Sequence, residues 1–200
     1  MRNYGVRWEG RNAIESFLRI LNDDSNNVLD WVKTCVSEFD ASYATLVKFI
    51  LITGLRKGEA INAFNLAIRL SRAGRLDEVY NAELETLELY KFPKVFLRRS
   101  KNAFFSFVPA VFINELVQSR TISETGLKRR LERRHMQSRL KALRHYHATF
   151  MVRNGLLREE ADLLQGRINQ SIFMRHYFSP SINELRQRAI AVVQRLLSLV

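Results

Sequence analysis

The chain has 200 residues, 46% of them hydrophobic, which is enough to bury the core of one domain with short appendages. Thirty-two lysines and arginines against 20 aspartates and glutamates give a net charge of +12 and a pI near 10.3, so we expect a polyanionic partner, nucleic acid before an acidic membrane. The single cysteine, Cys35, excludes a disulfide within the chain and a cysteine-based zinc site. No apolar segment is long enough for a signal peptide or a membrane span, so we expect a soluble, cytoplasmic protein.

Apolar residues recur at helical spacing through the first quarter of the chain. After an irregular start they predict helices over 12–21, 28–39 and 41–54, with a polar loop between the first two. Trp31 and Phe39 lie on the apolar side of the second helix, so we expect both in the core.

A further helix begins at or near Arg56, directly after the glycine that ends the previous one. An arginine at a helix amino terminus lies beside free backbone amides, and together they can bind a phosphate. Glu59 follows one turn later and can hold the Arg56 side chain in place. The alternative is a solvated basic turn formed by Arg56 and Lys57.

The next part of the chain predicts a β-hairpin. Residues 76–89 mix polar and apolar types and indicate a short helix with loops. β-Forming residues then occupy 95–97 and 104–108, with prolines near the strand ends and a turn between them. Lys101 falls in this turn, from which its side chain can reach over a groove.

A basic cluster follows the helix predicted over 110–120. It consists of Lys128, Arg129, Arg130, Arg133 and Arg134. On a helix these residues cover nearly all sides around Leu131, so the segment faces either solvent or a polyphosphate. The net charge of the chain favours DNA.

The helix predicted around 141–154 carries Lys141 and Arg144 three residues apart, so both side chains project from one face and can converge on one phosphate. We expect structural roles for His145 and His147, with His145 bracing the phosphate site. A further helix over 157–166 ends at a glycine, and Arg167 lies just beyond it.

Five stretches in this order carry a family resemblance: TGLRKGEA, SKNAFFSFVP, KALRHYHATFMVRNG, LLQGR and SIFMRHY. They resemble the catalytic domain of tyrosine recombinases, the phage-integrase class, and most closely the integrases of archaeal viruses and plasmids. The resemblance implies a mainly α (α+β) fold, a helical bundle with a small antiparallel β-sheet. It also implies site-specific cleavage and rejoining of DNA in the host cytoplasm through a covalent 3′-phosphotyrosine, with neither a metal nor a cofactor.

The resemblance implies a role for each matching residue. Arg56 and Arg144 are the two arginines that grip the scissile phosphate, Lys101 protonates the leaving 5′ oxygen, and Tyr177 is the nucleophile. Forty-five residues separate Arg56 from Lys101, more than in common bacterial recombinases, which suggests an insertion around residues 70–90 and leaves Lys94 as the alternative lysine.

Two positions depart from the common pattern of the family. Lys141 stands where most members have a histidine, and Arg167 stands where a later histidine or tryptophan is usual. Both replacements are basic, so the whole set is positively charged. Such a cluster offsets the charge of the phosphate and of the transition state, and it favours the phenolate of a tyrosine whose ordinary pKa is about 10.

The resemblance divides the chain into amino-terminal helices with a linker (1–42), the catalytic domain (43–178) and a carboxy-terminal amphipathic helix (179–200). That last helix packs either on its own domain or on a neighbouring protomer. No separate DNA-clamping domain is evident before the catalytic motifs, so we expect the chain to be the carboxy-terminal portion of a longer protein.

We expect double-stranded DNA as the partner, a tetramer assembled on it, and no membrane. Two other functions stay open: a DNA relaxer of the type IB topoisomerase kind, and a catalytically silent DNA-binding relative.

Overall fold

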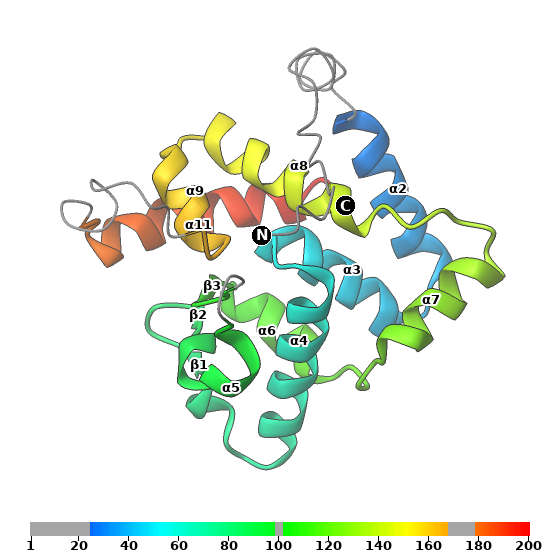
Figure 1. Ribbon diagram of the computed structural model, residues 1–200, viewed down its shortest axis with the longest axis horizontal. Helices are drawn as coiled ribbons and strands as arrows, with labels where there is room; N and C mark the ends of the chain where they lie inside the picture. The colour runs from blue at the N-terminus through cyan, green and yellow to red at the C-terminus, as the bar shows by residue number, and fades with distance from the viewer. Residues whose placement is uncertain (1–24, 99–101, 168–178) are drawn as a thin grey trace, which may run out of the picture.

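The computed structural model describes residues 25–98, 102–167 and 179–200. These residues form a mostly helical structure with one small antiparallel sheet on its flank, as Figure 1 shows. The predicted mainly helical α+β fold is confirmed. The helix predicted over 12–21 lies outside the described residues.

Helix α3 (Ala41–Thr53) is the centre of the core. Its sequence is apolar on all sides, and nine of its residues are buried, from Ala44 to Thr53 with only Lys48 more accessible. Helices α2 (Ser25–Glu38) and α8 (Leu140–Arg153) pack against it. The predicted end of α3 is confirmed, because Gly54 adopts φ 58° and its N–H returns to the Ile50 carbonyl.

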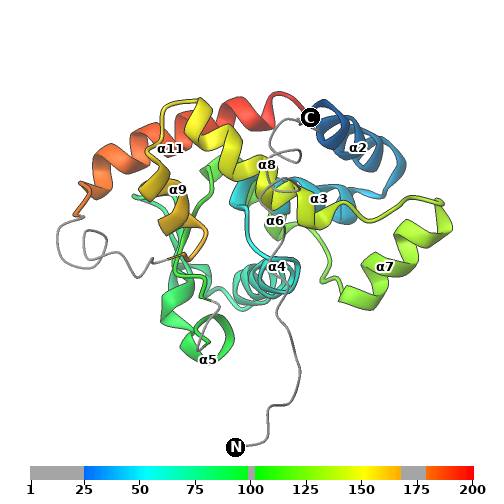
Figure 2. The same ribbon diagram turned by 45° about the horizontal axis from the view of Figure 1, so that its top comes forward.

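The remaining helices surround this centre. Helix α4 (Lys57–Arg72) follows α3 at once, and α6 (Ala110–Val117) packs on both. Helix α7 (Glu124–Arg133) stands at the edge of the molecule, and α9 (Arg158–Leu164) lies beside α8, as both views show (Figures 1 and 2).

The sheet differs from the predicted two-stranded hairpin. Its three antiparallel strands are β1 (Tyr80–Asn81), β2 (Thr86–Leu87) and β3 (Ser106–Phe107), in the order β1-β2-β3. The strand predicted over 104–108 is therefore real but shorter, and its partner is β2, with Thr86 opposite Phe107. Both other strands come from the segment in which we expected a short helix with loops; there, helical turns are limited to Leu76–Glu78 and Leu89–Lys91.

The strand predicted over 95–97 is wrong. Pro93 begins a single helical turn, α5 (Pro93–Phe96), because proline lacks an N–H that a first helical residue does not need. That turn buries Phe96 completely in the core. Only an isolated bridge between Leu97 and Asn102 remains of the expected pairing.

Helix α11 (Ile182–Leu197) packs on its own domain, which is one of the two arrangements predicted for it. Its apolar face, including Leu185, Val193 and Leu196, is buried against α3, α8 and β3. Arg188 also forms an ion pair with the buried carboxylate of Glu160 on α9. Figure 2 shows α11 and α8 crossing one another.

Candidate functional site

Three arginines gather where the ends of three helices meet. Arg56 is the N-cap of α4, Arg144 lies on α8, and Arg167 follows the end of α9. Burial and, to a smaller extent, the positive charges of Arg56 and Arg167 together lower the pKa of the Arg144 guanidinium to about 10. Arg144 remains protonated at neutral pH, so the three side chains form a concentrated positive charge.

Arg144 fastens two helix ends together. Its side chain is buried; Nη1 donates to the carbonyl of Gly54 at 2.7 Å, and Nη2 donates to the carbonyl of Gln165 at 2.7 Å. These two residues are the C-caps of α3 and α9, where carbonyls lack helical partners and the helix dipole favours a cation. Each C-cap precedes one of the other arginines by two residues, so Arg144 brings the segments of Arg56 and Arg167 side by side.

Arg56 is held by Glu59, as the sequence predicts. Glu59 Oε1 accepts from Arg56 Nη1 at 2.8 Å and Oε2 accepts from the Arg56 backbone N–H at 3.1 Å. The same carboxylate receives Arg98 Nη2 at 3.2 Å and is almost fully buried. The Glu59 carboxylate thus orients both Arg56 and Arg98, and these three side chains together keep a net positive charge.

Asn102 lies between Arg56 and the segment of Arg167. The Asn102 carbonyl is 3.5 Å from Arg56 Nη1, and the Asn102 side chain accepts from the Arg98 backbone N–H at 3.0 Å. On its other side Asn102 touches Gly166, where an added Cβ would lie 2.6 Å from the Asn102 carbonyl carbon and closer still to its oxygen.

Lys101, which the resemblance assigns to leaving-group protonation, and Tyr177, its nucleophile, both lie outside the described residues. Lys141 is exposed one turn before Arg144 on α8. Lys94, the alternative lysine, is exposed on α5. Arg167 is about half exposed, and within the described residues its side chain contacts Asp162, with Nη1 3.5 Å from Oδ1.

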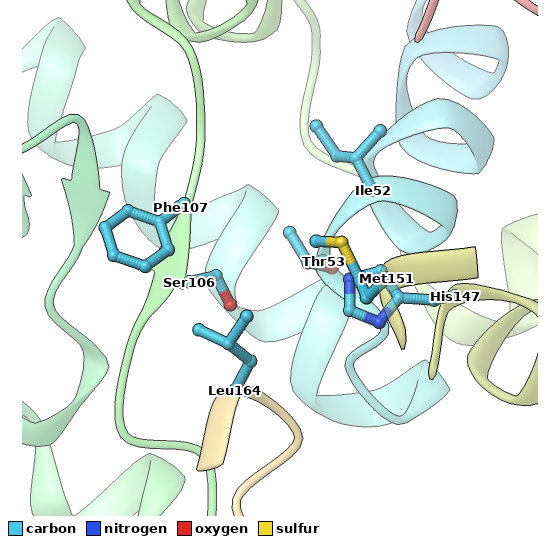
Figure 3. A pocket seen from close by; sticks show the side chains of 7 residues that line it. All are labelled: Ile52, Thr53, Ser106, Phe107, His147, Met151 and Leu164. Carbon is cyan, nitrogen blue, oxygen red and sulfur yellow. The ribbon is translucent and has the colours of Figure 1, made fainter. Parts of the chain in front are cut away.

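A buried histidine lies behind the arginines. His147 is buried on α8, whereas His145 is exposed. The His147 ring and Met151 form one wall of a cavity of about 10 Å³, and the Ser106 side chain on β3 points toward them (Figure 3). Burial, with a smaller contribution from the charge of Arg144, lowers the pKa of His147 to about 3. A hydrogen bond to the Ile52 backbone raises this pKa and offsets part of the decrease.

This histidine makes the stability depend on pH. In the unfolded chain it takes up a proton near its ordinary pKa of about 6.5, while the folded chain keeps it neutral down to about pH 3. The unfolded state therefore binds more protons between these values, and the free energy of unfolding falls as the pH drops below 6.5. We expect His147 to account for roughly 2 kcal/mol of lost stability between pH 7.5 and pH 5.

Urea unfolding of the native chain and of His147→Phe at both pH values measures this contribution. The pH dependence should be smaller in the variant by that amount. Replacing the exposed His135 with asparagine is the control and should leave the dependence unchanged. Equal pH dependence in all three proteins would contradict a neutral buried His147.

The basic cluster on α7 divides into two groups. Arg130 binds Asp40 at 2.6 Å and lies over the Tyr43 ring, and Arg134 binds Glu38 at 2.8 Å, so both fasten α7 to the junction of α2 and α3. Lys128 pairs with Glu132 along its own helix, at 3.6 Å. Arg129 and Arg133 are exposed, and no carboxylate of the described residues pairs with them.

A groove of about 660 Å³ lies between α7, the start of α4 and the start of α8, with Lys57, Lys128 and Leu140 in its walls. Among the described residues, no three histidine, cysteine, aspartate or glutamate side chains lie close enough together to hold a metal ion. No helix in the described part of the chain has both the length and the apolarity needed to cross a membrane.

The helical domain with its small sheet and its arginine cluster is the arrangement expected of a DNA integrase. The chain belongs to the archaeal phage integrase family, whose model matches residues 21–184. The family resemblance drawn from the ordered motifs is confirmed. Comparison with curated proteins and with solved structures found no significant match.

Sequence reasoning missed several residues that build this site. Gln165 and Asn102 carry the backbone carbonyls that meet Arg144 and Arg56, and nothing in their residue types marks that role. His147 was expected to be structural, but its place behind Arg144 was not foreseen. Gly54 and Gly166 are the exceptions, because the sequence predicts each as the end of a helix and each comes just before an arginine of the cluster.

Proposed function

We propose that this chain is the catalytic domain of a site-specific tyrosine recombinase, which cleaves and rejoins DNA through a 3′-phosphotyrosine. The observation that carries the proposal is the fastening of the Arg56 and Arg167 segments by Arg144. Membership of an integrase family supports it, as does the surplus of 12 positive charges, which suits a polyanionic substrate.

The positive cluster meets the main electrostatic difficulty of the reaction. A phosphodiester is an anion, and negative charge builds up on its oxygens as a nucleophile attacks. Arg56 and Arg167 lie close enough to Arg144 for their charges to lower its pKa, and in the described part of the chain the carboxylates that pair with Arg56 and Arg167 are those of Glu59 and Asp162. Because the donors are fixed before the substrate binds, they stabilise the developing charge without reorganisation.

In the proposed reaction the Tyr177 oxygen forms a bond to phosphorus while the bond to the 5′ oxygen breaks. Tyr177 reacts as the phenolate, its proton having passed to solvent, and the positive charge of Lys141 favours that form. Lys101 gives a proton to the leaving 5′ oxygen. The product is a 3′-phosphotyrosine and a free 5′ hydroxyl. Attack by the 5′ hydroxyl of another strand reverses these steps, so rejoining requires no nucleotide cofactor.

DNA contacts outside the reacting phosphate are assigned to α7. Arg129 and Arg133 are exposed on this helix, pair with no carboxylate in the described ranges and are assigned to the DNA backbone, whereas Arg130 and Arg134 mainly hold the helix. Lys128, whose partner Glu132 is exposed on the same helix, can join the first group. Strand exchange in this class requires two duplexes, so we propose a tetramer assembled on DNA.

A suicide DNA substrate tests the proposal. It carries a nick near the cleavage point, so that the short released strand diffuses away and traps the covalent intermediate. We expect an adduct that survives denaturation, with the modified peptide containing Tyr177, and we expect none with Tyr177→Phe. An adduct with both proteins, or with neither, would sink the assignment.

The same preparation separates the alternative functions. A recombinase exchanges strands between two matching sites, whereas a DNA relaxer removes supercoils from a plasmid with no need for a second site. Binding of DNA without any adduct identifies the catalytically silent relative.

A further inference from the structure

A second layer of contacts lies beneath the arginine cluster and involves two residues that need not touch the substrate. His147 follows Arg144 by three residues on α8, so its side chain projects from the same helix face about one turn further along the helix. Gln165 is the C-cap of α9, and both side chains are buried.

Gln165 and Arg144 hold each other through two separate bonds. The Arg144 guanidinium donates to the Gln165 carbonyl at 2.7 Å, and the Gln165 side-chain amide donates to the Arg144 carbonyl at 2.8 Å. This reciprocal pair joins α8 to the carboxy-terminal end of α9. A shift of either residue breaks both bonds, so the pair resists sliding of one helix end along the other.

His147 secures the opposite side of the same junction. Its Nδ1 is 3.3 Å from the Gln165 amide nitrogen, and its ring packs on Gly54, where an added Cβ would lie 2.6 Å from the ring Cγ. Because the amide nitrogen is a donor, Nδ1 is the acceptor, and the imidazole carries its proton on Nε2. The ring therefore contacts both residues whose carbonyls receive Arg144.

From this arrangement we infer that Gln165 and His147 are positioning residues for Arg144, which orient its guanidinium toward the reacting phosphate. They hold the two acceptor carbonyls at fixed places on either side of the arginine. The inference rests on the proposed function, since it specifies how one arginine of that site is oriented. It predicts a loss of catalysis without the loss of any group that contacts DNA.

Gln165→Met tests the inference, because methionine has nearly the same length and shape but neither donates nor accepts these bonds. The backbone carbonyl that receives Arg144 is kept. We expect cleavage of a normal phosphodiester to fall about 100-fold, the size of effect that a displaced catalytic group produces, while DNA binding changes less than about two-fold. Gln118→Met is the matched control, since Gln118 is also a helix C-cap but is exposed on α6.

A methylphosphonate at the cleavage point separates positioning from general damage. The methylphosphonate has no negative charge for Arg144 to offset. Its rate of cleavage should therefore not depend on how the Arg144 guanidinium is oriented. We expect Gln165→Met to cleave it within about five-fold of the native rate. The comparison between the two substrates is independent of the folded fraction, because both meet the same protein preparation.

His147→Phe provides a second variant that keeps the ring volume and removes both nitrogens. It should show the same contrast between the two substrates. The inference is overturned if either variant cleaves the phosphodiester at the native rate, or if both substrates are slowed equally. If the native chain forms no adduct at Tyr177, the proposed function itself has failed, and that result is distinct from either of the others.

Discussion

Arg144→Lys is expected to reduce DNA cleavage at least about 1,000-fold while leaving non-covalent DNA binding nearly unchanged. Lysine keeps the positive charge, so long-range attraction to DNA persists. A single ammonium group cannot reproduce a planar fork that reaches two carbonyls on different helices and still faces a phosphate. The loss should therefore appear in the rate of adduct formation rather than in affinity.

The same substitution should destabilise the fold. The carbonyls of Gly54 and Gln165 each receive a 2.7 Å bond from Arg144, and at least one of them would lose its partner in a buried place. An unsatisfied buried acceptor costs about 1–3 kcal/mol, and we expect a decrease of that size in the free energy of unfolding in urea. Arg69→Lys, at an exposed position near the end of α4, serves as the control. Cleavage within ten-fold of native by Arg144→Lys would rule out this role.

The helical part of the fold could be predicted because its helices are long enough to show periodicity. Helix α11 buries one continuous apolar face, and α3 is instead a run of apolar residues that Gly54 ends; the boundaries of both agree with the prediction within a few residues. The sheet could not be predicted in the same way. Its strands have two residues each, which is too short for alternation to appear, and β3 pairs with a segment about 20 residues earlier in the chain.

The candidate site, too, could be predicted only in part from the sequence. Arg56, Arg144 and Arg167 were recognised from ordered motifs, and the structure brings the three together. Gln165 and His147 were not recognised as parts of the site, because their role arises only when the end of α9 packs against α8. Hydrogen bonds between a side chain and a distant carbonyl leave no periodic trace in a sequence.

Gly166→Ala is expected to disrupt both stability and catalysis, because Gly166 combines a left-handed backbone with a close neighbour. Its φ is 66°, a conformation that costs an alanine about 1 kcal/mol. An added Cβ would also overlap the Asn102 carbonyl, which is backbone and has little room to withdraw. We expect overpacking to add about 1–3 kcal/mol to the loss of unfolding free energy.

Gly74→Ala separates the two causes. Gly74 has φ 69°, almost the same backbone conformation, but an added Cβ there meets nothing within 4 Å. This control carries the backbone strain alone, so it should lose about 1 kcal/mol and keep full cleavage activity. The difference between the two variants in urea unfolding then measures the overlap with Asn102.

The catalytic consequence follows from what Asn102 and Gly166 adjoin. Asn102 contacts Arg56 through its carbonyl, and Gly166 directly precedes Arg167, so forcing them apart moves two arginines of the cluster in opposite directions. A displacement of about 1 Å is enough to cost about 100-fold in rate, and we expect Gly166→Ala to lose at least that much cleavage even at temperatures where it is fully folded. If Gly166→Ala and Gly74→Ala cleave DNA equally well, the contact between Asn102 and Gly166 at the end of α9 has no part in organising the site.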